Sequence, residues 1–318
     1  MKIYLTSELL KANLSPTAYY IKPLLPVGCK AIIFGLFKSG KSFLAQQIAL
    51  ELAAGKPVLG IFPTTKCKVL YLENELPETS LQKRLVKPFG VYKGDFYVAR
   101  TLAKLNDWEG YLEFREVIEK VEPNVIIIDC LYSAVVGDIS EGVTANSSTT
   151  ALDGLLSIVP NSSMIIIHHQ RKQSKEREDA GMEEMLGSIQ IAGWADTLIR
   201  LIPSGEKKTL RFVLRHDESP YPLTLSFNPK TLLFSAKAVN VDNAEEFIKD
   251  LLEKRELTRK DLVKEAEKHD LGRSTLDKAL GELKKKGMII SRGLGREGTV
   301  YELTEKAVLK EADRQQVN

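Results

Sequence analysis

The stretch Ala31-Ile32-Ile33-Phe34-Gly35-Leu36-Phe37-Lys38-Ser39-Gly40-Lys41-Ser42 decides the fold of this chain. It begins with a short apolar run typical of a buried strand, and from Gly35 to Ser42 it fits G-x-x-x-x-G-K-[ST] in full. Helical spacing of apolar residues follows from Lys41 to Ala54. The glycines allow a tight turn whose N–H groups point inward at phosphate oxygens, and the helix presents its positive amino-terminal end to them. The stretch therefore predicts an ATP-binding loop between a strand and a helix.

Several side chains of this loop are predicted to contact Mg²⁺ and ATP. The Lys41 ammonium is expected to reach the β- and γ-phosphates, and the Ser42 hydroxyl is expected to hold Mg²⁺. Asp129 ends the apolar run 125–128, where an acidic side chain is placed to orient a Mg²⁺-bound water. The predicted metal ligands are thus Ser42 and Asp129. The predicted nucleotide contacts are Gly35, Lys38, Ser39, Gly40, Lys41, Ser42 and Phe43.

A general base for hydrolysis is expected in the segment Tyr71 to Glu75, just past another buried strand. A carboxylate beside the γ-phosphate can take a proton from the attacking water if it lies within hydrogen-bond reach. Strand alternation sends Glu73 and Glu75 to the same side, so this pattern leaves both as candidates. At the end of a further strand, His168 and His169 face opposite ways, and at most one of them is expected to touch the γ-phosphate.

The alternation of strands and helices up to about residue 200 predicts an α/β fold with a mainly parallel sheet between helices. Continuous apolar runs are what strands buried on both faces require. Shorter runs follow, separated by turn residues, and predict antiparallel strands that extend the sheet. The predicted strands are 31–34, 69–72, 125–128, 164–167, 197–202, 209–214, 223–227 and 232–234, and the predicted helices are 41–54, 80–88, 108–121 and 149–158.

Composition limits the class of protein. A length of 318 residues suggests two domains, and the net charge of +3 does not by itself indicate nucleic acid or a membrane surface. Cys29, Cys67 and Cys130 are too far apart in sequence for a metal-ligand motif or a disulfide scaffold. The first ten residues lack the pattern of a signal peptide, and no apolar stretch has the length of a membrane span. These features predict a soluble cytoplasmic protein with no membrane partner.

A second, smaller domain is predicted after residue 238, where the sequence becomes strongly charged. We expect a nucleotide-binding domain over 1–238, a linker over 239–243, three helices and a β-hairpin over 244–304, and a polar tail over 305–318. The order of these elements resembles a winged helix-turn-helix, whose third helix enters the major groove of duplex DNA.

The third helix and the wing are expected to contact DNA, with contact to another protein as the alternative. Seven basic and three acidic residues between Leu271 and Gly298 give a local charge of +4, which favours duplex phosphates. The predicted DNA contacts are Arg273, Ser274, Thr275, Lys278 and Lys285 on the helix and Arg292 and Arg296 at the wing.

The order of motifs resembles the RecA-like ATPases of the plasmid-replication helicase (RepA-type, AAA_25-like) group, near the hexameric replicative helicases. The resemblance covers about Tyr20 to Asp217. It implies a RecA-like core in which Glu75, rather than Glu73, is the catalytic carboxylate and His169 is the γ-phosphate sensor. The motifs that carry it are Gly35–Ser42, Tyr71–Glu75, the Asp129 strand, His168-His169-Gln170-Arg171-Lys172, Gly187-Ser188 and Ala195-Asp196.

The resemblance also implies a homo-oligomer, with a hexameric ring as its expected form and ATP between adjacent subunits. A basic finger on a late strand, typically Lys-x-Arg, then reaches the nucleotide from the neighbouring subunit. Here the matching stretch is Leu214-Arg215-His216-Asp217, in which Asp217 occupies the arginine position. Arg215 is the first choice for the finger and Arg211 the second.

Two loops correspond to DNA-contacting segments of such rings, 136–146 and 171–181. They imply that single-stranded DNA passes through the ring channel. The leading hypothesis is an ATP-hydrolysing enzyme coupled to DNA, a replication helicase or helicase-accessory protein of a mobile element. The alternative is an ATP-switched DNA-binding regulator or partitioning factor that does not unwind DNA.

Overall fold

The computed structural model describes most of the chain: residues 4–13, 16–89, 94–170, 189–204, 207–220, 222–237, 241–268, 271, 273–293 and 298–304. Three predicted features lie outside the described residues, namely the second channel loop 171–181, the wing residue Arg296 and the tail 305–318. Among the helices that the structure describes, none combines the length and the apolar character needed to cross a membrane.

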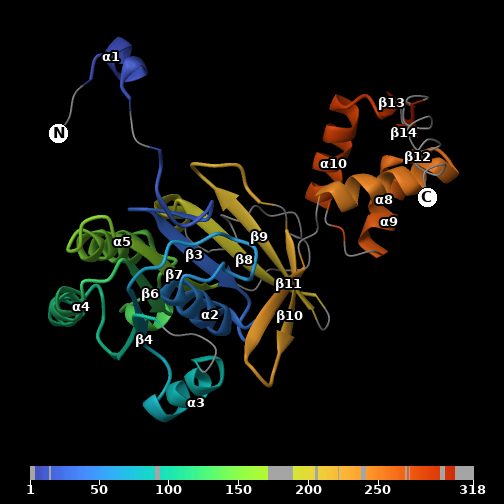
Figure 1. Ribbon diagram of the computed structural model, residues 1–318. Helices are drawn as coiled ribbons and strands as arrows, with labels where there is room; N and C mark the ends of the chain where they lie inside the picture. Colours follow the sequence, from blue (N-terminus) through green and yellow to red (C-terminus); the bar gives the residue numbers. More distant parts are fainter. Residues whose placement is uncertain are drawn as a thin grey trace.

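A nine-stranded sheet forms the centre of the larger part of the molecule (Figure 1). Its strand order is β11-β10-β9-β8-β3-β7-β6-β4-β5. The strands from β8 to β5 in this order run parallel, whereas β9, β10 and β11 run antiparallel. The predicted α/β fold with a mainly parallel sheet is therefore confirmed. The strands are β3 (Lys30–Gly35), β4 (Val69–Glu73), β5 (Phe96–Arg100), β6 (Val125–Asp129), β7 (Ser163–His169), β8 (Thr197–Ser204), β9 (Lys207–Leu214), β10 (Leu223–Asn228) and β11 (Leu233–Lys237).

Helices cover both faces of the sheet because the central strands are apolar on both sides. The strands β4 and β6 are buried throughout, and β3 and β7 are buried except at one end. On one face, Leu44, Ile48 and Leu52 of α2 (Lys41–Ala54) pack into one hydrophobic cluster. The second cluster, on the other face, contains α4 (Trp108–Val121), α5 (Gly142–Leu156) and α7 (Ile189–Trp194) (Figure 1).

The helix α2 is tied to the antiparallel end of the sheet by a buried glutamine. The Gln47 side chain donates to the Phe234 carbonyl oxygen (3.0 Å) and accepts from the Phe234 N–H (2.7 Å). This paired contact fixes β11 beside α2. The Gly40 end of the nucleotide-binding loop lies beside the same strand, because a Cβ on Gly40 would be 3.2 Å from the Phe234 ring.

The direction of β8 differs from the sequence-based prediction, which expected an antiparallel strand. Residues 31–35 of β3 pair with 197–201 of β8 in parallel register. A parallel neighbour needs a crossover connection, and the chain between His169 and Thr197, which contains α7, is long enough to supply one. The antiparallel pairing begins only with β9.

Element boundaries also differ from the predicted ones. The helix α5 begins at Gly142, so the last residues of the predicted loop 136–146 are helical. The helix α8 (Val241–Lys254) begins inside the predicted linker 239–243. The edge strand β5 is absent from the prediction because its residues are exposed or half-buried and form no buried apolar run. Further short elements before the sheet are α1 (Thr6–Lys11), β1 (Tyr19–Ile21) and β2 (Leu25–Pro26).

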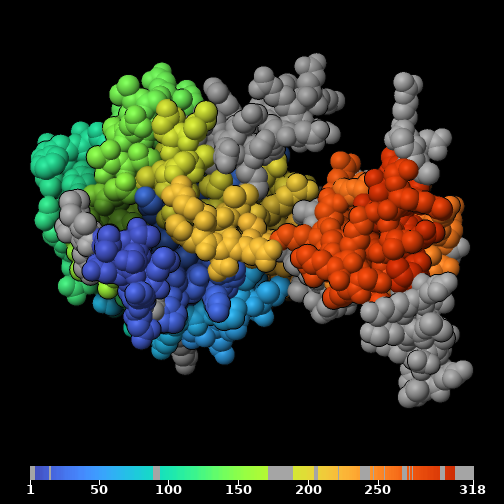
Figure 2. Space-filling view, turned by 90° about the horizontal axis from the view of Figure 1, so that it is seen from above, coloured from blue at the N-terminus to red at the C-terminus, as the bar shows by residue number. Residues whose placement is uncertain are grey.

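The carboxyl-terminal elements form a separate group with its own core, seen as an orange and red lobe in Figure 2. As the helical spacing predicted, Leu276, Leu280 and Leu283 are buried in this core. The backbone N–H of Asp261 donates to the Thr258 hydroxyl (3.1 Å), which matches the expected cap. The group contains α8, α9 (Arg259–Lys268) and α10 (Arg273–Lys285), with an antiparallel sheet of β12 (Leu257–Thr258), β14 (Thr299–Leu303) and β13 (Ile289–Gly293).

Candidate nucleotide site

The loop Gly35–Ser42 lies at the carboxyl edge of the parallel strands, where α/β sheets commonly bind ligands. Gly40 has a left-handed backbone (φ 99°), which glycine adopts without strain. A Cβ on Gly35 would lie 2.4 Å from the Leu201 carbonyl oxygen of β8, so only glycine fits there. The loop borders a pocket of about 310 Å³. The pocket is lined by Phe37, Lys38, Gly40, Lys41, Ser42, Phe43, Glu73, Glu75, Leu76, Arg84, Asp129, Ile167 and His169.

Lys41 is a buried cation of this pocket, with 4% of its surface exposed. Its Nζ donates hydrogen bonds to the carbonyl oxygens of Gly35 (3.1 Å) and Leu36 (2.9 Å). Burial lowers the pKa of Lys41, and the nearby acidic groups, Asp129 first among them, oppose that shift. The ammonium therefore lies inside the loop, at a place where phosphate oxygens can replace the carbonyl acceptors.

Ser42 and Asp129 form a pair of oxygen donors beside the loop. Asp129 is buried and accepts a hydrogen bond from the Tyr71 hydroxyl. Burial raises the pKa of Asp129, whereas Tyr71 and the nearby Ser42 lower it. Mg²⁺ prefers oxygen ligands of this kind. Ser39 adds a buried hydroxyl that has no hydrogen-bond partner among the described residues. The residues thus fit a Mg²⁺–ATP complex, with Ser42 and Asp129 as the proposed metal ligands.

Glu75 enters the pocket from beyond the end of β4, with a half-exposed side chain. Its Oε1 accepts hydrogen bonds from Ser133 Oγ (2.7 Å) and Cys130 Sγ (3.1 Å). His169 Nε2 lies 3.9 Å from the same oxygen, a distance of an ion pair rather than a hydrogen bond. The proximity of His169, with the hydrogen bonds from Ser133 and Cys130, lowers the pKa of Glu75 to about 2. Glu75 is therefore ionised at neutral pH, as a general base must be.

Glu73 occupies a different environment from Glu75, contrary to the strand alternation assumed from the sequence. The strand β4 ends at Glu73, so the chain beyond it no longer alternates. Glu73 is buried, and its Oε1 accepts from the backbone N–H groups of Glu75 and Leu76 (3.0 Å each). Burial, followed by the charge of Asp129, raises the pKa of Glu73 to about 7. Glu73 thus shapes the turn that presents Glu75, and Glu75 is the better placed of the two to act as the base.

The two histidines at the end of β7 separate as strand alternation predicts. His169 lines the pocket, and its ring centroid lies 5.5 Å from that of Phe37 in the loop. The His169 Nδ1 is buried without a hydrogen-bond partner among the described residues. His168 is buried and is not part of the pocket lining. His169 is therefore the histidine placed to touch the nucleotide.

Arg84, on α3 (Glu78–Phe89), is a pocket residue that the sequence analysis missed. Its guanidinium carbon lies 4.8 Å from the centroid of the Phe43 ring, which holds the side chain at the pocket. Its charge also lowers the pKa of Glu73. No sequence motif identifies Arg84. Its neighbour Lys83 is also basic, so the sequence does not indicate which of the two side chains enters the pocket. Only the packing of α3 against the loop side of the sheet selects Arg84.

Replacing Arg84 with alanine is expected to lower kcat for ATP hydrolysis by about 10- to 100-fold, because a fixed cation is lost where phosphate charge develops. The measurement is steady-state hydrolysis over a range of ATP concentrations. Lys83→Ala, which removes an exposed charge from the same helix, is the matched control. Equal kcat in wild type and Arg84→Ala would show that Arg84 has no part in the reaction.

Arg215 lies at the opposite edge of the sheet from the nucleotide loop. Arg215 follows Leu214, the last residue of β9, which pairs with Thr197 at the start of β8. The start of β8 lies beside the start of β3, whereas the nucleotide loop follows the end of β3. Arg215 Nη1 donates to Asp196 Oδ1 (2.9 Å), and Nη2 donates to the Gly193 carbonyl oxygen (2.6 Å). Arg211, the second choice, lies within β9 opposite Arg200. Arg215 is therefore not among the residues that line the nucleotide pocket of its own chain.

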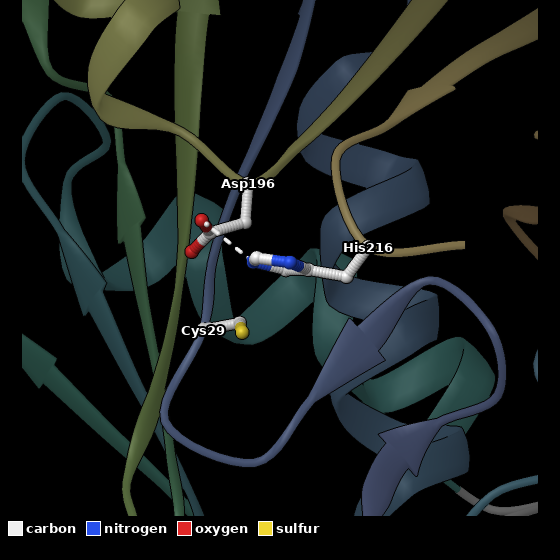
Figure 3. Close-up of side chains that lie close together, drawn as sticks. All are labelled: Cys29, Asp196 and His216. Carbon is white, nitrogen blue, oxygen red and sulfur yellow. Dashed lines mark hydrogen bonds and ion pairs between the residues drawn. The ribbon is translucent and has the colours of Figure 1, made fainter. Parts of the chain in front are cut away.

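Asp196, which binds Arg215, also lies beside His216 and Cys29. Figure 3 shows Asp196, His216 and Cys29. One metal-ligating atom from each of Cys29, Asp196 and His216 lies within 4.8 Å of the others, although the three are distant in sequence. Asp196 Oδ1 contacts Arg215 and also His216 Nε2 (3.2 Å), and its Oδ2 accepts from the Lys30 N–H (3.0 Å). Burial first, with Asp196, raises the pKa of Cys29 to about 11. The hydrogen bonds of the Asp196 carboxylate to Arg215, His216 and the Lys30 N–H favour an anchor for Arg215.

Thr275 is a predicted DNA contact that the structure rules out. Its side chain is fully buried, together with Ala279 and Leu283, because these residues share one face of α10. This burial contradicts the sequence-based prediction that Thr275 lies on the exposed side of the helix. The Ser274 side chain and Arg296 lie outside the described part of the chain.

Most of the other predicted DNA contacts are engaged within the protein. The Arg292 side chain pairs with Glu256 and lies 3.8 Å from Glu302. Lys285 and Lys278 also have partners: Lys285 pairs with Glu282 (2.8 Å), and Lys278 donates to the Ser219 carbonyl oxygen (3.1 Å). Arg273 lines a groove at the amino-terminal end of α10, together with Arg259, Lys260, Val263, Lys264, Gly298 and Thr299.

Residues 4–175, more than half of the chain, match the AAA domain family (AAA_25). No curated protein matches this chain. Among solved structures, the ATPase domain of G40P is similar with a TM-score of 0.51 and 13% identity, covering 65% of this chain and 84% of that chain. A DnaB-like replicative helicase, solved in a study of its interactions with primase, is similar with a TM-score of 0.52 and 14% identity. That match covers 72% of this chain and 63% of the helicase chain. The shared fold and the family match show that this chain belongs to the AAA domain family, as a RecA-like, ATP-hydrolysing enzyme.

Proposed function

We propose that this enzyme couples ATP hydrolysis to work on DNA, as a replication helicase or helicase-accessory protein of a mobile element. The observation that carries the proposal is the division of the site between the two edges of the sheet. Lys41, Glu75 and His169 lie together at one edge, and Arg215 lies at the other. A complete site then needs a second copy of the chain, which supports a ring with ATP between subunits. The likeness to a DnaB-like replicative helicase is consistent with this arrangement.

The proposed reaction is hydrolysis of ATP to ADP and phosphate. The water oxygen bonds to the γ-phosphorus, the bond from that phosphorus to the bridging oxygen of ADP breaks, and a water proton passes to the Glu75 carboxylate. Lys41 and Arg84 stabilise the charge on the phosphate oxygens, and His169 contacts the γ-phosphate. Mg²⁺, held by Ser42 and Asp129, would neutralise charge on the β- and γ-phosphates. Arg215 of a neighbouring copy completes the site.

The carboxyl-terminal group is proposed to be a winged helix-turn-helix that binds duplex DNA. Its three helices and three-stranded sheet have the order expected for that module. The groove lined by Lys260, Lys264 and Arg273 gathers three basic side chains at one place, which favours contact with phosphates. We therefore propose that the contacts with the phosphate backbone of the DNA are centred on α9 and the start of α10.

Replacing Lys260 and Lys264 together with alanine is expected to weaken duplex binding and to lower the slope of log affinity against log salt by about 1.8. Each lost phosphate contact removes roughly 0.9 from that slope. The measurement is anisotropy of a labelled duplex at several salt concentrations. The double variant Lys120→Ala/Lys230→Ala is the charge-matched control, because it removes two exposed lysines from the nucleotide-binding part of the chain. An unchanged slope in the groove variant would place duplex binding elsewhere.

The test of the proposed function is steady-state ATP hydrolysis without DNA, with single-stranded DNA and with duplex DNA at one low salt concentration. Lys41→Ala run alongside excludes a contaminating ATPase. Stimulation by single-stranded DNA that requires Lys41 is the result expected of a motor whose ring engages DNA. Turnover that requires Lys41 but responds to neither DNA would overturn the coupling to DNA.

A second candidate function is an ATP-switched regulator or partitioning factor that binds duplex DNA without unwinding it. The basic groove on the carboxyl-terminal group is the observation that favours it, because duplex binding alone suffices for such a role. Slow turnover combined with sequence-specific duplex binding would select this alternative.

A further inference from the structure

Glu75 is held through one of its two carboxylate oxygens. The contacts from Ser133 Oγ (2.7 Å), Cys130 Sγ (3.1 Å) and His169 Nε2 (3.9 Å) all involve Oε1. The two hydrogen-bond donors follow β6 directly: Cys130 comes after Asp129, and Ser133 lies in the short 3-10 helix η1 (Tyr132–Ala134). Hydrogen bonds to a charged group restrict its rotation and favour its ionised form.

We propose that Ser133 and Cys130 are positioning residues for hydrolysis, which fix Oε1 of Glu75 so that Oε2 is left to accept the proton of the attacking water. This inference rests on the proposed role of Glu75 as the general base. Neither residue is among those that line the pocket. Both act through Glu75.

The segment that carries Ser133 is itself fixed on its inner side. Leu131 and Ala134 are buried, and the Leu105 N–H donates to the Ala134 carbonyl oxygen (2.7 Å). The Lys104 side chain donates to the carbonyl oxygen of Ser133. These contacts with the adjacent residues Lys104 and Leu105 hold the segment that carries the Ser133 hydroxyl.

The same segment is exposed just beyond η1. Val136 is 57% exposed, and its backbone N–H and carbonyl oxygen each form a 2.8 Å hydrogen bond with the Asn106 side chain. The predicted channel loop begins at this residue. Ser133 therefore lies three residues before the start of the exposed segment and is itself hydrogen-bonded to Glu75.

The charged and titratable groups that line the pocket with Glu75 come from each of its elements. They are Lys38 in the loop, Lys41 on α2, Glu73 on β4, Arg84 on α3, Asp129 on β6 and His169 on β7. Among the described residues, Ser133 supplies the one side-chain hydroxyl that donates a hydrogen bond to Glu75. None of the charged groups that line the pocket makes this hydrogen bond in its place.

The test compares Ser133→Ala, Ser133→Thr and Cys130→Ser in the full chain, with kcat and KM for ATP measured separately. Ser133→Ala is expected to lower kcat about tenfold, the effect of one hydrogen bond to a charged group, while KM stays within about twofold. Ser133→Thr keeps a hydroxyl and is expected to restore kcat, and Cys130→Ser keeps a donor and is expected to retain it. Ser157→Ala, which removes an exposed serine hydroxyl at the end of α5, is the control.

A second arm combines Ser133→Ala with Glu75→Gln. Because Ser133 acts through Glu75, the double variant is expected to be no slower than Glu75→Gln alone. A further loss in the double variant, or wild-type kcat in Ser133→Ala, would overturn the positioning role and leave the proposed ATPase intact. Absence of Lys41-dependent turnover in the wild type would instead overturn the proposed function, and this inference with it.

Discussion

Replacing Glu75 with glutamine is expected to lower kcat for ATP hydrolysis by about 10²- to 10⁴-fold, the usual contribution of a general base. Glutamine has nearly the same shape, and its carbonyl oxygen can still accept from Ser133 and Cys130 at the place of Oε1. It cannot take the proton of the attacking water. ATP binding should remain within a few fold of wild type, because the contacts of Lys41 and Ser42 are unchanged.

Two measurements separate binding from chemistry in this variant. Steady-state hydrolysis gives kcat, and titration with a fluorescent ATP analogue gives Kd. Glu78→Gln, a change of the same kind at an exposed position of α3, is the matched control. If Glu75→Gln hydrolysed ATP as fast as wild type, Glu75 would not be the base, and Glu73 would be the next residue to replace.

Replacing Lys41 with alanine is expected to remove detectable ATP binding and to leave only a small residual turnover. The variant loses the buried ammonium that the phosphates need and leaves the Gly35 and Leu36 carbonyl oxygens without their donor. Loss of one such donor to developing charge lowers kcat by about 10²- to 10³-fold. Wild-type protein at about 100 times the Kd for ATP should be stabilised by about 2.7 kcal/mol, and the variant should show no such stabilisation.

Thermal unfolding with and without Mg²⁺–ATP measures both effects on one sample. The unfolding temperature of the variant without nucleotide, compared with that of wild type, reports whether the substitution itself destabilises the protein. Lys56→Ala, at an exposed position just after α2, is the control and should keep the ATP-dependent shift. A full ATP-dependent shift in Lys41→Ala would contradict the assignment of the phosphate site.

The sequence was sufficient for the parts of the protein that depend on local pattern. The buried strands β3, β4, β6 and β7 are continuous apolar runs, so their burial on both faces follows from composition alone. The loop at Gly35–Ser42 is contiguous, and its glycines and lysine act on neighbouring atoms. The helices α2 and α4 begin and end where the sequence pattern predicts them.

The tertiary structure decided everything that depends on which distant segments meet. The direction of β8 depends on its crossover, and the buried place of Glu73 depends on where β4 ends. Arg84 belongs to the pocket only because α3 packs beside it. Sequence spacing constrains neighbours along one element, whereas packing and hydrogen bonding between elements set which side chains share a site. For that reason the sequence alone determined an ATP-binding α/β fold, and only the folded chain placed Ser133 on Glu75 and Arg215 at the far edge of the sheet.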